Sequence, residues 1–115
     1  MLTVYHNASC SKSQGVCNLL LARGIQPEIV EYLNTPPDRA TLQNLLALLQ
    51  MQPSELIRKS EPIFLELFGA EVPSDTRCLE AMLQYPILIE RPIIVMDGKA
   101  IIGRPPEKVL AFLGE

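Results

Sequence analysis

The sequence predicts an α/β fold with a four-stranded mixed sheet, in the order β-α-β, a helical block, then β-β-α. Three patterns support this prediction. An apolar run at residues 2–5 leads into a helical segment and then into a β-branched run at 27–33. Leucines in the middle of the chain recur at spacings of three and four, the helical period. Two apolar runs flank Asp97-Gly98, a dipeptide typical of hairpin turns.

The N-terminal third predicts two parallel strands joined by a helix. Residues 2–5 favour a first strand, and a helix is expected from residue 11 or 13 to about residue 23. Gly24 stands where a helix often ends on a glycine. The stretch "PEIVEYL" (27–33) favours the second strand. Two parallel strands joined by a helix imply a right-handed crossover.

The middle of the chain predicts a block of short helices. The stretch "ATLQNLLALLQ" (40–50) has helical leucine spacing, and Pro53 suits the first turn of the next helix. Further helices are expected within 61–69 and 74–86. After the hairpin, "PPEKVLAFL" (105–113) is expected to form a last helix with proline in its first turn. The chain is therefore predicted to be one domain, 1–115, with a helical insertion at about 38–86.

Composition and charge narrow the class of protein. The chain has 115 residues, of which 48% are hydrophobic and 20% charged, as expected for one folded domain. Its net charge of -3 argues against a nucleic-acid binder. No apolar run approaches the roughly 20 residues that span a bilayer, and the N-terminus does not resemble a signal peptide. We therefore expect a cytoplasmic protein whose three cysteines are thiols.

One of these cysteines, Cys10 in "YHNASCSKS" (5–13), occurs where the first strand leads into the first helix. In α/β sheets this edge binds ligands, and a helix N-terminus favours anions and thiolates. A free cysteine has a pKa of roughly 8.5, so lowering it by ~2 units takes about 2.7 kcal/mol. A helix N-terminus with a nearby cation, His6 or Lys12, would supply this. A buried structural thiol is the alternative interpretation.

The residues after Cys10 exclude several cysteine motifs. Position 13 is serine, so the Cys-x-x-Cys pair of a disulfide oxidoreductase is absent. Residues 11–17 contain no arginine, which the loop of cysteine phosphatases requires, and "NASCSKSQG" (7–15) does not match a P-loop. Cys10 is therefore predicted to work as a single thiol, and any oxyanion it binds must receive its arginines from elsewhere in the chain.

The remaining cysteines and the histidine predict neither a disulfide nor a metal site. Cys17 lies seven residues after Cys10, roughly 10 Å along a helix, too far for a disulfide. We expect Cys17 to pack in the core and Cys78 to be structural. His6 is the one histidine in the sequence, whereas metal sites need several ligands.

Three arginines occur at predicted element boundaries, where functional groups are often carried. Arg58 follows a helix in "LIRKSEP", Arg91 precedes the hairpin in "IERPIIV", and Arg104 follows it in "IIGRPPEKV". Arginine presents a planar fork of donors that suits oxyanions. Each could also be an ordinary surface charge when considered alone.

The four segments that carry Cys10, Arg58, Arg91 and Arg104 together resemble the glutaredoxin-linked arsenate reductase family, in order and over almost the whole chain. The resemblance implies a thioredoxin-like fold with a helical insertion. It also implies that Cys10 is the nucleophile, that the three arginines converge on it to hold an oxyanion, and that His6 and Ser13 support it. Because thioredoxin-like folds place a cis-proline opposite the active cysteine, Arg91-Pro92 is expected to be cis.

The resemblance further implies that the protein reduces arsenate, with glutathione and glutaredoxin as partners. The Cys10 thiolate would attack arsenic, glutathione would attack the adduct, and glutaredoxin would resolve the mixed disulfide. No bound cofactor or metal is implied. Ala8 stands where the family commonly has proline, and Gly103 where well-known members have cysteine.

Two alternatives stay open at the level of sequence. Spx-like regulators share this fold and bind RNA polymerase, but their redox-sensing members carry Cys-x-x-Cys, whereas this chain has Cys10 and Ser13. A monothiol transferase that acts on glutathione mixed disulfides would use Cys10 and have little need for three arginines.

Overall fold

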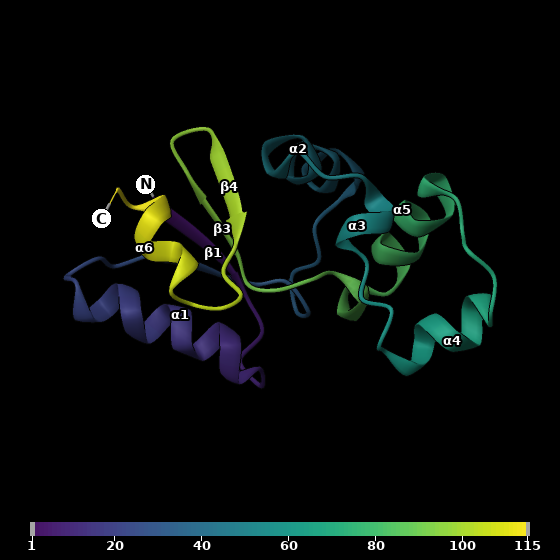
Figure 1. Cartoon of the computed structure of the whole chain (residues 1–115), viewed down its shortest axis with the longest axis horizontal. Helices are drawn as coiled ribbons and strands as arrows, with labels where there is room; N and C mark the ends of the chain where they lie inside the picture. Colours follow the sequence, from purple (N-terminus) through teal and green to yellow (C-terminus); the bar gives the residue numbers. More distant parts are fainter. Residues whose placement is uncertain (1, 115) are drawn as a thin grey trace. The chain divides into compact units, whose positions relative to one another are not determined.

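The computed structural model describes residues 2–114, and its sheet confirms the predicted α/β class. The four strands are β1 (Leu2–His6), β2 (Glu28–Glu31), β3 (Ile93–Met96) and β4 (Lys99–Ile102). They lie in the order β2-β1-β3-β4. β1 pairs with β2 in parallel, while the β1–β3 and β3–β4 pairs are antiparallel. Figure 1 shows the hairpin of β3 and β4 beside β1.

The predicted helical stretches are all helical in the structure. The helices are α1 (Ser11–Ala22), α2 (Arg39–Leu49), α3 (Pro53–Leu56), α4 (Pro62–Phe68), α5 (Asp75–Gln84) and α6 (Lys108–Phe112), with a short 3-10 helix η1 (Pro86–Leu88) that the sequence did not predict. The expected proline in the first turn of the last helix is wrong, because Pro105 and Pro106 lie in a turn that precedes α6. Their carbonyl oxygens accept hydrogen bonds from the N–H groups of Lys108 and Val109.

Residues 2–114 form two compact units, which we call the sheet unit (2–35 with 91–114) and the helical unit (36–90). The core of the sheet unit lies on the face of the sheet that α1 and α6 cover (Figure 1). Its fully buried members are Leu2, Val4, Val16, Leu20, Ile94 and Val109. Side chains of a strand alternate between faces, so Leu2, Val4 and His6 of β1 share one face.

The helical unit has its own buried side chains on α2 to α5 and η1. Its aromatic residues Phe64 and Phe68 pack edge to face, with ring centroids 5.0 Å apart. Ile57, just after α3, bridges to Ile89, just after η1, and this pairing ties two distant segments together. Among the described residues, no helix is both long and apolar enough to cross a membrane.

Candidate active site

Cys10 occupies the N-terminal cap of α1, as the sequence predicted. Its backbone is extended, with φ -99° and ψ 120°, and its carbonyl accepts the first helical hydrogen bond from Gln14 at 3.0 Å. Its N–H donates to the carbonyl of Asn7 at 3.0 Å. The thiol therefore lies between the carboxyl end of β1 and the first N–H groups of a helix, where anions are stabilised.

Buried polar side chains hold the loop that carries Cys10. The side-chain oxygen of Asn7 accepts hydrogen bonds from the N–H and the hydroxyl of Ser9, at 3.0 and 2.9 Å. The hydroxyl of Ser13, which is completely buried, accepts the N–H of Asn7 at 3.3 Å. Ser13 thus links the first turn of α1 to the end of β1, which suits the supporting role expected of it.

The pKa of the Cys10 thiol lies below its ordinary value, as the sequence predicted. Partial burial raises this pKa, but the opposing effects outweigh it. In order of size these are the backbone N–H of Ser13, the side chain of Arg91 as a hydrogen-bond donor, the N–H of Lys12 and the charge of Arg91. The cation at the thiol is therefore Arg91, while Lys12 acts through its backbone and not its charge.

Arg91 and Arg104 come together in the sheet unit. Arg91 is about nine-tenths buried and follows the helical unit directly in sequence. The Arg91-Pro92 bond is cis, which confirms the prediction, and Arg104-Pro105 is also cis. Nη1 of Arg104 donates to the carbonyl of Arg91 at 3.5 Å. Two of the three expected arginines thus lie near Cys10 or beside the arginine that contacts it.

Gly103 keeps the end of β4 close to the core of the sheet unit. Its N–H donates to the carbonyl of Pro92 at 2.9 Å. A Cβ here would lie 2.7 Å from Ile94 and 2.9 Å from Val16, closer than real contacts allow, and 3.2 Å from Val109, which is a tight contact. Packing therefore explains the glycine beside Arg104.

Arg58 belongs to the helical unit and is held by two carboxylates. Its Nη1 lies 2.8 Å from Oε1 of Glu90, and its Nε lies 3.2 Å from Oε1 of Glu61. All three side chains are largely buried. The backbone adds to this link, since the N–H of Arg58 donates to Leu88 at 2.7 Å. The predicted third arginine is thus neutralised within its own unit.

Neither of these carboxylates was predicted from the sequence as a partner of Arg58. The signal was present, since Glu61 follows Arg58 by three residues and Glu90 directly precedes Arg91. A carboxylate close in sequence to a candidate arginine indicates that ion pairing must be weighed beside anion binding.

His6 lies at the end of β1 and lines a polar cavity of about 180 Å³. The cavity is lined by His6, Asn7, Ala8, Ser9, Glu31, Leu33 and Asn34. Burial lowers the pKa of His6, and the charge of Glu31 opposes this effect in part. The Nδ1 atom of His6 lies 3.7 Å from Sγ of Cys17. The lowered pKa argues against a charged His6 at neutral pH, and so against the electrostatic support of Cys10 that was expected from it.

The other two cysteines are also thiols, Cys17 in the sheet unit and Cys78 in the helical unit. Cys17 is half-buried and packs against the core of the sheet unit, whereas Cys78 is fully buried in the helical unit. Burial raises the pKa of both thiols. Neither has the environment of a reactive thiolate.

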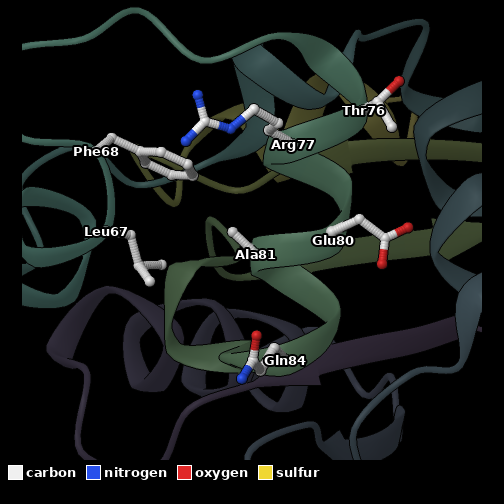
Figure 2. Close-up of a pocket in the computed structure, with 7 residues that line it drawn as sticks. All are labelled: Leu67, Phe68, Thr76, Arg77, Glu80, Ala81 and Gln84. Atoms are coloured by element: carbon white, nitrogen blue, oxygen red, sulfur yellow. The ribbon is translucent and has the colours of Figure 1, made fainter.

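The helical unit contains a second cavity, of about 250 Å³, that no sequence pattern indicated. It is lined by Leu67, Phe68, Thr76, Arg77, Glu80, Ala81 and Gln84 (Figure 2). The guanidinium of Arg77 lies 5.0 Å from the ring centroid of Phe68 and pairs with Glu71 at 3.1 Å. The lining residues come from α4 and α5.

Comparison with known proteins identifies the relatives of this chain. The model of the ArsC family matches residues 5–112. The uncharacterized protein YfgD of Escherichia coli K12 is 49% identical over 113 residues, which cover 96% of this chain and 95% of that protein. The arsenate reductase of the same strain is 39% identical, over 97% of this chain and 80% of that protein.

A solved structure shows that the similarity extends to three dimensions. The arsenate reductase from Vibrio cholerae matches with a TM-score of 0.89 and 40% identity, covering 96% of this chain and 95% of that one. The mixed sheet and the helices of the present structure thus follow the thioredoxin-like architecture of this group.

Proposed function

The chain belongs to the ArsC family, and from this premise we propose that it reduces arsenate to arsenite through Cys10, with electrons from glutathione and glutaredoxin. Relatives named arsenate reductase support the substrate class. The observation that carries the proposal is the environment of Cys10: a helix N-terminus and a buried arginine favour its thiolate, the form that attacks an electrophile.

The proposed chemistry converts one arsenate and two thiols into arsenite, a disulfide and water. The Cys10 thiolate forms an S–As bond, and one arsenate oxygen leaves as hydroxide or water. Glutathione then attacks the adduct, As(V) gains two electrons, and two sulfur atoms become a disulfide. Glutaredoxin resolves the mixed disulfide. Because position 13 is serine, the second thiol must come from outside the chain.

Arginine donors would neutralise the charge on the arsenate oxygens, usually the largest contribution in such sites. The contact of Arg91 with Cys10 supports this role for Arg91, and the bond of Arg104 to the Arg91 carbonyl supports it for Arg104. Arg58 would have to exchange Glu61 and Glu90 for the oxyanion. His6 and Ser13 would support the loop without touching arsenic.

The setting of this reaction is also part of the proposal. We treat residues 1–115 as a single arsenate-reductase-like domain with a helical insertion. Glutathione acts as co-substrate, and no tightly bound cofactor or metal takes part in the scheme. A reaction that depends on reduced glutathione belongs in a reducing compartment, so we place it in the cytoplasm.

A coupled assay with arsenate, glutathione and glutaredoxin tests the proposal. Arsenite should form at a rate that depends on all three, and Cys10→Ser should reduce it to the rate without protein. Cys78→Ala serves as a control, since Cys78 is a buried thiol of the helical unit and not a nucleophile in the scheme. If no arsenite forms while Cys10 cleaves glutathione mixed disulfides, the monothiol transferase alternative replaces the proposal. Binding to RNA polymerase without either activity would favour a regulator.

A further inference from the structure

The contact between His6 and Cys17 joins the end of β1 to the middle of α1. Leu2 and Val4 share a face of β1 with His6 and pack in the core that α1 covers. His6 continues this row, although it is polar and only 9% exposed. Its Nδ1 lies 3.7 Å from Sγ of Cys17, which is itself packed against the core. The imidazole therefore has one nitrogen engaged by a thiol.

The protonation states of the two groups limit how they can interact. Burial raises the pKa of Cys17 above its ordinary value, so its sulfur keeps its hydrogen at neutral pH. Burial lowers the pKa of His6, while the charge of Glu31, its register partner on β2, acts against this shift. At neutral pH the pair thus consists of a thiol and a neutral imidazole, which has one N–H and one lone pair.

Two hydrogen-bond arrangements are then possible, and they differ in strength. With a hydrogen on Nδ1, the ring would donate to a thiol sulfur, which is a weak acceptor. With a bare Nδ1, the thiol hydrogen would point to a nitrogen lone pair, the acceptor of a neutral imidazole. The second arrangement uses the one good acceptor of the pair and gives the hydrogen of the half-buried thiol a partner.

We propose that Cys17 is a positioning residue for His6, and that its thiol fixes the imidazole as the neutral Nε2–H tautomer. His6 then presents a donor, not a base, in the wall of the 180 Å³ cavity next to the Cys10 loop. A neutral imidazole in this state can donate to an oxygen of a bound ligand, a role known from other enzymes.

The tautomer can be read directly by NMR on the full chain. The sequence has one histidine, so a long-range ¹H–¹⁵N spectrum of uniformly ¹⁵N-labelled protein shows one imidazole. At pH 7.5 we expect Nε2 to resonate as a protonated, pyrrole-type nitrogen and Nδ1 as a pyridine-type nitrogen. A protonated Nδ1 with a pyridine-type Nε2 would overturn the proposal. This measurement requires only the wild-type protein.

Variants of Cys17 test whether this thiol is the cause. Cys17→Ala removes the donor, and the ratio of Nε2–H to Nδ1–H tautomer should fall by about 2- to 10-fold, the range expected for one hydrogen bond. The pKa of His6 should rise, since a bond to the neutral form is lost. Cys17→Ser, which keeps a donor, should move both values back toward wild type. Cys17→Val, which fills the space without a donor, should behave like Cys17→Ala.

Controls separate this role from simple packing and from the proposed function. Cys78→Ala removes a buried thiol of the helical unit and should leave the His6 spectrum unchanged. A spectrum that stays the same in Cys17→Ala and Cys17→Val would overturn the role of Cys17. Because the readout does not involve arsenate, a protein without arsenate turnover would contradict the proposed function but leave this test intact.

Discussion

Helices begin differently in the two units of the molecule. In the helical unit, α2 and α5 are capped by side-chain oxygens: Asp38 accepts the N–H of Thr41 at 2.8 Å, and Ser74 accepts the N–H of Arg77 at 3.3 Å. In the sheet unit, α1 begins at Cys10 with no such oxygen. Its first N–H groups instead stabilise the thiolate. The first N–H groups of α2 and α5 thus contribute to helix stability, whereas those of α1 act on a reactive thiol.

The two largely buried arginines show the same contrast. Arg91 faces a thiol and lowers its pKa, so its charge serves a reactive group. Arg58 faces Glu61 and Glu90, so its charge serves to join two segments of the helical unit. Residue type and burial alone therefore do not identify an oxyanion-binding arginine, because its partners decide what its charge does.

Replacing Arg91 should have the largest effect. Arg91→Ala removes a donor from the thiolate and from the proposed arsenate site, so kcat should fall by about 10²–10³. The pKa of Cys10 should rise, as followed by thiolate absorbance against pH. Arg77→Ala, which removes an exposed arginine of the helical unit, is the control and should change neither value. An unchanged Cys10 pKa in Arg91→Ala would contradict the contrast drawn between Arg91, which acts on a thiol, and Arg58, which acts on two carboxylates.

Replacing Arg58 should instead act on stability. Arg58→Ala leaves Glu61 and Glu90 without their shared cation, and the free energy of unfolding should fall by about 1.5–3 kcal/mol. The pKa of Cys10 should stay the same. If Arg58 also binds the arsenate oxygens, as proposed above, turnover should fall as well. Urea denaturation measures the loss. In the control Arg39→Ala, whose pair with Glu80 is half-exposed, the loss should stay under about 1 kcal/mol. Equal losses would contradict the structural role of Arg58.

Removing a cap from the helical unit should have a moderate effect. Ser74→Ala takes away the oxygen that accepts the N–H of Arg77, and the free energy of unfolding should fall by about 1 kcal/mol. Ser74→Asn keeps an acceptor at the same position and should retain most of the stability. A Ser74→Ala protein as stable as wild type would show that this end of α5 depends on other contacts.

Cys10→Ser should have the smallest effect on stability, and it should stabilise the protein, whereas Arg58→Ala and Ser74→Ala should destabilise it. Serine is a better N-cap than a thiol, so the free energy of unfolding should rise by about 0.5–1 kcal/mol at acidic and neutral pH. The folded pKa of Cys10 is lower than its ordinary value. The wild type therefore gains stability as pH rises from the folded toward the unfolded pKa, and this gain is lost as pH falls through the folded pKa.

The difference between the two proteins should accordingly shrink between neutral pH and about pH 9. Urea denaturation at several pH values measures it. Cys17 and Cys78 are present in both proteins, so their titration cancels in the difference. A difference that is constant over this range would contradict a lowered Cys10 pKa.

Much of the fold and part of the site could be predicted from local sequence signals. The strand, turn and helix around Cys10, the Asp97-Gly98 hairpin and the helical middle each depend on periodicity and turn chemistry over a few residues. Cys10 could be placed at the start of α1 for the same reason. The cis bond at Pro92 followed from the resemblance, not from local chemistry.

Contacts between residues that are distant along the chain could not be predicted from the sequence. Whether Arg58 pairs with Glu90, 32 residues away, or with an anion depends on how Ile57 and Ile89 bring their segments together. The same holds for Arg91 at the Cys10 thiol and for the thiol of Cys17 at His6. Local signals determined where each charge and thiol stands in its helix or strand. Only the folded chain decided their partners, because electrostatic and hydrogen-bond energies depend on distances that local sequence does not define.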